Sequence, residues 1–147
     1  MEALEKIKQI GKFVDEWKLP SEEDVRFVEK NLNIKYPKSY VNYLLNYSNI
    51  IFGFFDHLKM TLIEDFEWLY AMNVINDAWN IDGIPKYLIP FIEDNGDYYC
   101  FDTRFQNNGE YSIKYWSHNG TTDERWDNFT DWVEKCWLGE YLKSQNI

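Results

Sequence analysis

The chain has 147 residues and a formal net charge of −10, and this length predicts one domain over residues 1–147. Hydrophobic residues make up 45% of the chain and aromatic residues 19%, which excludes an intrinsically disordered protein. The acidic balance argues against direct binding of nucleic acid or of anionic membranes, because both need a basic surface. It favours a cationic protein partner, although the same charge can serve solubility alone.

The chain has no apolar run of membrane-spanning length, and its charged first residues lack the apolar core of a secretory signal. We therefore expect a cytoplasmic protein. Cys100 and Cys136 are far apart in the sequence, so we expect two buried thiols and no disulfide framework or zinc site.

Three helices are predicted in the first third of the chain. Residues 4–17 repeat apolar side chains at helical spacing. A second helix begins after Ser21, whose side chain can cap the free backbone N–H groups, and ends near residue 32. A third helix follows Pro37 and ends near residue 47, and the apolar run 50–55 indicates a buried strand.

The middle of the chain gives the weakest patterns. Residues 58–63 could form a short strand, residues 66–78 a helix, and residues 82–85 a loop.

Three β-rich runs then alternate with Asn-Gly pairs. The runs 88–93 and 97–103 are joined by Asn95-Gly96, the pair favoured in two-residue hairpin turns because both positions need positive φ. Asn108-Gly109 precedes the run 111–116, and Asn119-Gly120 follows it. This pattern predicts an antiparallel meander.

A final helix is predicted to begin near Asp127 and to fray or end at Gly139. Its apolar stripe consists of Phe129, Trp132, Val133, Cys136 and Trp137. The expected fold class is therefore α+β, with a central antiparallel or mixed sheet that includes a C-terminal β-meander packed by N-terminal and C-terminal helices.

The first hairpin concentrates acidic side chains. The stretch 93–103 contains four carboxylates and no lysine or arginine, and the next basic residue is Arg104. The carboxylates belong to Glu93, Asp94, Asp97 and Asp102. Such carboxylates can act as general acid and base on a glycosidic bond, bind calcium, form an acidic rim for a basic protein, or serve only as turn-forming, solvated residues.

Aromatic residues beside these carboxylates suggest further roles. Trp79 or Trp116 could stack on a sugar, and Tyr98 or Trp116 could anchor a protein partner. In the second strand, Tyr98 and Cys100 lie on one face, while Tyr99 and Phe101 lie on the other. Large side chains on both faces mean that both are covered or that one is a binding surface.

Known catalytic and metal motifs are absent from the sequence. It contains no phosphate-binding glycine loop, no Gly-x-Ser-x-Gly and no His-Glu-x-x-His. His57 and His118 have no second histidine or cysteine at ligand spacing. We expect no catalytic residues, no metal and no cofactor.

Several segments in order resemble the SUKH superfamily, the Smi/Knr-like proteins. The helical segments 19–33 and 36–45, the hairpin 89–102, the strand 113–118 and the helix start 126–133 are similar to the family's patterns. The segment after the third helix departs from the glycine-rich turn that is frequent in the family.

This resemblance implies an α+β, non-catalytic bacterial immunity protein that binds and neutralises a cognate polymorphic toxin. The acidic charge suits a basic, nuclease-type toxin, because a nuclease presents a basic face to its substrate. The expected partner-binding residues are Glu93, Asp94, Asp97, Asp102, Tyr98 and Trp116. A regulatory adaptor of the same fold is a second possible function, and a carbohydrate-active protein is a third, weaker one.

Overall fold

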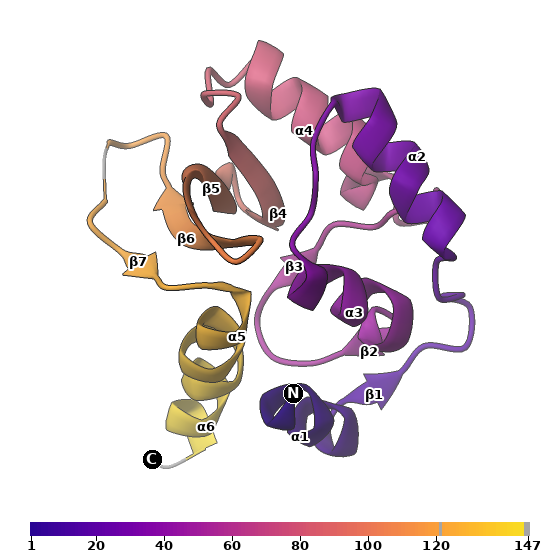
Figure 1. Ribbon diagram of the computed structural model, residues 1–147. Helices are drawn as coiled ribbons and strands as arrows, with labels where there is room; N and C mark the ends of the chain where they lie inside the picture. Colours follow the sequence, from indigo (N-terminus) through magenta and orange to yellow (C-terminus); the bar gives the residue numbers. More distant parts are fainter. Residues whose placement is uncertain (121, 146–147) are drawn as a thin grey trace.

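The structure is a computed structural model that describes residues 1–120 and 122–145. A five-stranded antiparallel sheet in the order β3-β4-β5-β6-β7 lies at its centre, with helices around it (Figure 1). The strands of this sheet are β3 (Asp56–His57), β4 (Leu88–Asp94), β5 (Asp97–Asn107), β6 (Glu110–Trp116) and β7 (Arg125–Trp126). A separate antiparallel pair consists of β1 (Lys12–Phe13) and β2 (Ile50–Ile51). The predicted α+β fold is confirmed.

Helices flank the central sheet. They are α1 (Glu2–Ile10), α2 (Glu22–Leu32), α3 (Lys38–Tyr47), the 3₁₀ turn η1 (Glu67–Leu69), α4 (Ala71–Asn80), α5 (Phe129–Trp132), the π-helical η2 (Val133–Leu138) and α6 (Gly139–Gln145). In Figure 1, α2 and α4 lie side by side at the top, while α5 and α6 lie on the opposite side of the molecule. Among the described residues, none of the helices is both long and apolar enough to cross a bilayer.

The first helix is shorter than its apolar periodicity predicts. It ends at Ile10, and the chain continues from Gly11 into β1, which pairs with β2. Trp17 does not extend the helix, because its ring packs edge-on against Phe66 at a centroid distance of 5.1 Å. The prediction of a helix over residues 4–17 was therefore wrong beyond Ile10.

The second and third helices are confirmed. At the start of α2, the Ser21 hydroxyl accepts a hydrogen bond from the Asp24 backbone N–H, and the Asp24 carboxylate accepts one from the Ser21 N–H. This reciprocal capping box satisfies two N–H groups that have no partner within the helix. Asn33 ends the helix in the left-handed region.

The segment between α3 and η1 differs most from the prediction. The expected strand 50–55 is reduced to β2, and Phe54 beyond it is 62% exposed. Residues 58–63 form no strand of the sheet, and only Lys59 makes a single bridge, to Tyr70. An apolar run forms a strand only where a neighbouring backbone pairs with it. Here the segment that pairs with β4 is β3, which ends at His57, just before the predicted strand. The helix expected over residues 66–78 is present as η1 and α4.

The predicted meander is confirmed. Asn95 and Gly96 join β4 to β5 with φ of 52° and 91°, and Asn108 and Gly109 join β5 to β6 with φ of 53° and 80°. Positive φ at both central positions matches the type I′ hairpin. Pro90 lies inside β4, beside an irregularity in its register with β5, where a missing N–H is tolerated.

Both faces of the sheet are covered. Phe91, Tyr99 and Phe101 pack into the main core against α3, which contributes Tyr40, and α5, which contributes Phe129 and Trp132. Tyr98 and Cys100 pack on the opposite face, against Ala78 of α4. Cys100 and Cys136 are buried free thiols, as expected.

The final helix contains the predicted buried stripe but continues past Gly139. Asn128, next to the expected Asp127, caps its start by accepting a hydrogen bond from the Asp131 N–H. Gly139 has helical dihedral angles, and a Cβ there would lie 3.0 Å from the Glu134 carbonyl oxygen. The absence of a side chain therefore accommodates the wide π-helical turn, and the helix extends through α6 to Gln145.

Candidate functional site

The β4–β5 hairpin and the adjoining strand β3 bring acidic residues together in two like-charged cross-strand pairs. In the antiparallel register, Asp56 of β3 lies opposite Glu93 of β4, and Asp94 lies opposite Asp97 across the Asn-Gly turn. Like charges placed directly opposite each other in a sheet are destabilising. The fold therefore maintains an arrangement that folding alone does not favour.

Asp97 is held by three hydrogen bonds. Its carboxylate accepts from the His118 backbone N–H at 3.0 Å, contacts His118 Nδ1 at 2.6 Å, and accepts from the Tyr115 hydroxyl at 3.0 Å. Burial acts to raise the pKa of this carboxyl, but the bonds from His118 and Tyr115 outweigh it and hold the pKa below its usual value. Asp97 therefore carries its negative charge in a fixed position.

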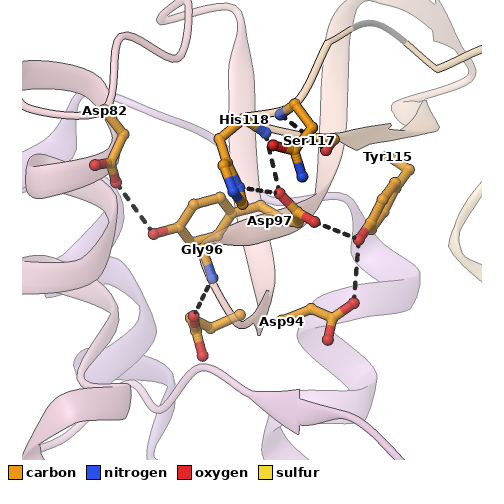
Figure 2. Close-up of polar contacts among 10 residues, drawn as sticks. Asp82, Asp94, Gly96, Asp97, Tyr115, Ser117 and His118 are labelled. Atoms are coloured by element: carbon orange, nitrogen blue, oxygen red, sulfur yellow. Dashed lines mark hydrogen bonds and ion pairs between the residues drawn. The ribbon is translucent and has the colours of Figure 1, made fainter.

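The Tyr115 hydroxyl connects the two carboxylates of the turn. Figure 2 shows Asp94 and Asp97 both directed at this hydroxyl, which lies 3.2 Å from an Asp94 oxygen and 3.0 Å from an Asp97 oxygen. A single hydroxyl proton can serve one carboxylate fully at a time. The remaining lone pairs of Asp94 are therefore available to an external donor.

Charge compensation at this site is incomplete. Among residues 1–120 and 122–145, no ion pair involves Asp56, Glu93 or Asp94. Burial, with a further contribution from Asp94, raises the pKa of Asp56, although Lys59 acts in the opposite sense. Asp56 and Asp94 thus belong to one acidic cluster, although they stand in different cross-strand pairs. We call Asp56, Glu93, Asp94 and Asp97 the acidic surface.

Asp102 lies apart from this surface. It has no exposed area and accepts three hydrogen bonds from Arg104, one from the backbone N–H at 3.2 Å and two from the guanidinium at 3.0 and 2.9 Å, while Arg125 lies 3.6 Å away. Its carboxylate is thus already neutralised inside the protein, and we do not retain Asp102 among the partner-binding residues. Arg104 lies two positions after Asp102 and so on the same face of the strand, but Arg125 reaches Asp102 only in the folded sheet.

The two aromatic candidates differ in accessibility. Tyr98 is 6% exposed, packs beneath the sheet and donates to Asp82 at 3.2 Å. It is therefore a part of the core more than a contact residue. Trp116 is half-buried and lines a pocket of about 250 Å³ together with Tyr115 and His118. Trp116 thus remains a candidate anchor.

Asp56 is a functional candidate that the sequence patterns do not reveal. It lies 37 positions before Glu93, as their numbers show, and only strand pairing places it beside the hairpin. The sole sequence signal was the polar pair Asp56-His57 within an apolar region.

A calcium site and a sugar-binding site gain no support from the geometry. No group of three or more metal-ligating side chains is gathered within the described part of the chain. Trp79 is not free to stack on a sugar, because it is half-buried and its indole N–H donates to the Leu88 carbonyl at 2.8 Å.

Comparisons with known proteins find similarity over most of the chain. A crystal structure described only as a protein from Pseudomonas syringae pv. tomato is similar, with a TM-score of 0.78 and 27% sequence identity over 94% of this chain and 98% of that chain. No curated protein matches the chain. The family model SUKH_5, described as SMI1-KNR4 cell-wall, matches residues 1–138. The chain therefore belongs to this SUKH family.

Proposed function

We propose that this protein is a bacterial immunity protein, which binds a cognate polymorphic toxin in the cytoplasm and neutralises it without catalysis of its own. The observation that carries this proposal is the acidic surface, in which Asp56 faces Glu93 and Asp94 faces Asp97. Three of these four carboxylates form no ion pair within the described residues. A basic partner would supply the missing cations.

The partner that fits best is a basic, nuclease-type toxin. A nuclease needs a cationic face for its phosphate substrate, and an acidic inhibitor can cover that face. A net charge of −10 would also accelerate encounter with such a partner. Membership of the SUKH family supports a protein partner in general.

The test uses a basic nuclease domain encoded directly beside this gene, if the genome carries one there, prepared in a catalytically inactive form. The measured quantity is its rate of association with this protein. The triple variant Asp56→Asn, Glu93→Gln and Asp94→Asn keeps the shape of the acidic surface and removes three charges. We expect its association rate constant to fall by about tenfold at low salt, with a flatter dependence on NaCl concentration.

A matched control removes the same number of charges elsewhere. Glu23→Gln, Asp77→Asn and Glu134→Gln are exposed positions on three helices. The control should retain most of the association rate and its salt dependence. Equal rates for the two triple variants would refute the acidic surface as the contact, and an absence of any complex would refute the immunity function.

A regulatory adaptor of the same fold is the second candidate, favoured by the family description as SMI1-KNR4 cell-wall. An adaptor could use the same acidic surface on a different basic partner. Rescue of growth distinguishes the two functions. The immunity proposal expects that co-expression of this protein protects cells from the active neighbouring toxin, and an adaptor gives no protection.

A further inference from the structure

A pocket lined mostly by aromatic and aliphatic side chains adjoins the acidic surface at Asp56. It has a volume of about 190 Å³ and lies between the segment that follows β2 and the segment that contains η1. Its lining includes Trp17, Ile51, Phe54, Phe55, Asp56 and Phe66. We call it the Phe54 pocket.

The size of this pocket suits one side chain. Pockets that hold drug-sized molecules span about 300–1,000 Å³, whereas the Phe54 pocket has about 190 Å³. The edge-on pair of Trp17 and Phe66 builds one aromatic wall. A single large apolar side chain from a protein is therefore a better occupant than a free ligand.

The rim of the pocket exposes apolar surface to solvent. Phe54 is 62% exposed and Ile51 is 50% exposed. Grouped apolar side chains beside a concave site are typical of protein interaction surfaces. In an interface, such a rim would exclude water from contacts made at the centre.

The accessible charge beside the pocket is negative. Lys59 also lines the pocket, but it is buried, with Nζ 3.7 Å from the centre of the Trp17 ring and 3.2 Å from the Ser48 carbonyl oxygen. Its cation is thus directed into the protein. Asp56, which is exposed and opposite Glu93, supplies the charge at the rim.

We propose that the toxin inserts one large apolar side chain into the Phe54 pocket, while a neighbouring lysine or arginine of the toxin pairs with Asp56 and Asp94. This inference rests on the proposed immunity function and extends its contact surface from the hairpin to the pocket. The recognised element is therefore an apolar residue flanked by a base. The apolar contact acts after encounter, so it slows dissociation, whereas the acidic surface speeds association.

Substitution of the exposed rim tests the pocket. Phe54→Ala should raise the dissociation rate constant of the complex with the inactive toxin domain by about tenfold or more, with little change in association. Phe27→Ala is the matched control, because Phe27 is 56% exposed and lies on α2. Its dissociation rate should equal that of the wild type. Thermal unfolding of both variants verifies that they are folded.

A photo-crosslinker locates the contact without removal of the aromatic ring. Benzoylphenylalanine in place of Phe54 should crosslink to the toxin domain at an apolar residue with a lysine or arginine within a few positions, and the same group in place of Phe27 should not. Mass spectrometry identifies the crosslinked residue.

The outcomes separate the two proposals. If the wild type binds the toxin while Phe54→Ala and Phe27→Ala dissociate at equal rates and position 54 gives no crosslink, the pocket inference is overturned and the immunity function stands. If the wild type forms no complex with the toxin, both fall together.

Discussion

His57 is a buried histidine whose ring packs among aromatic rings. Its centroid lies 4.2 Å from that of Trp137 and 5.2 Å from that of Tyr43, and neither ring nitrogen has a hydrogen-bond partner among the described residues. Burial, with a smaller contribution from Lys59, holds the pKa of His57 well below its usual range. The folded protein therefore keeps this ring neutral.

This burial predicts a loss of stability in mild acid. Below the ordinary histidine pKa of about 6.5, the unfolded chain binds a proton that the folded chain does not. The free energy of unfolding therefore decreases as the pH is lowered, by up to about 1.4 kcal/mol per pH unit. Above pH 6.5 this contribution is complete. His57→Phe should remove the slope between pH 6.5 and 5, as measured by urea unfolding.

The control for this prediction is the second histidine. His118 is exposed, so His118→Gln should leave the slope due to His57 in place. A His57→Phe variant that still loses stability as steeply as the wild type over this pH range would contradict the assignment.

At the scale of single elements, features that depend on local chemistry were predicted correctly, whereas a helix end that depends on tertiary strand pairing was not. The Ser21 cap of α2 and the turn Asn95-Gly96 were predicted correctly, because each is completed within four residues of sequence. The end of α1 was not. Its apolar spacing continues past Gly11, but β1 leaves the helix to pair with β2, about 40 residues away.

Gly11 should be intolerant of even a methyl group. A Cβ at this position would lie 2.5 Å from Ile50 Cγ2 and 2.7 Å from the Ile7 carbonyl oxygen. Helix propensity alone predicts that Gly11→Ala gains up to about 1 kcal/mol. We instead expect a loss of about 1–3 kcal/mol in the free energy of unfolding, because the methyl group must displace β2 or the helix end.

The matched control for this substitution is Gln9→Ala on the same helix. Gln9 is exposed, and the change should stay within about 0.5 kcal/mol of the wild type. Denaturant unfolding of both variants measures the difference. A Gly11→Ala variant more stable than the wild type would contradict the predicted clash with Ile50 and Ile7.

For the whole molecule, the net charge of −10 favours solubility, but the repulsion between the negative charges destabilises the folded state. We expect the midpoint of thermal unfolding to rise between about 0.01 M and 0.15 M NaCl, because the Debye length falls from about 30 Å to about 8 Å. Scanning calorimetry measures this shift.

The acidic surface should account for part of that effect. The variant Asp56→Asn, Glu93→Gln and Asp94→Asn should have a higher midpoint at low salt than the wild type and a smaller rise with NaCl, because two like-charged pairs are relieved. A wild-type midpoint that is independent of salt would contradict a cost of self-repulsion.

The sequence by itself determined the α+β class, the meander, the capped second helix and the buried stripe of the last helix. These features depend on periodicity and on turn chemistry, which are complete within short stretches of chain. It also placed Glu93, Asp94 and Asp97 on one hairpin.

Only the tertiary structure decided which charges are free and what lies beside them. It buried Asp102 between two arginines, brought Asp56 opposite Glu93, and joined Trp17, Phe54 and Phe66 into one pocket. Apart from Arg104, which lies two positions after Asp102, these contacts link residues far apart in the chain, so no local pattern specifies them. They exist because strand pairing and core packing bring those segments to the same place.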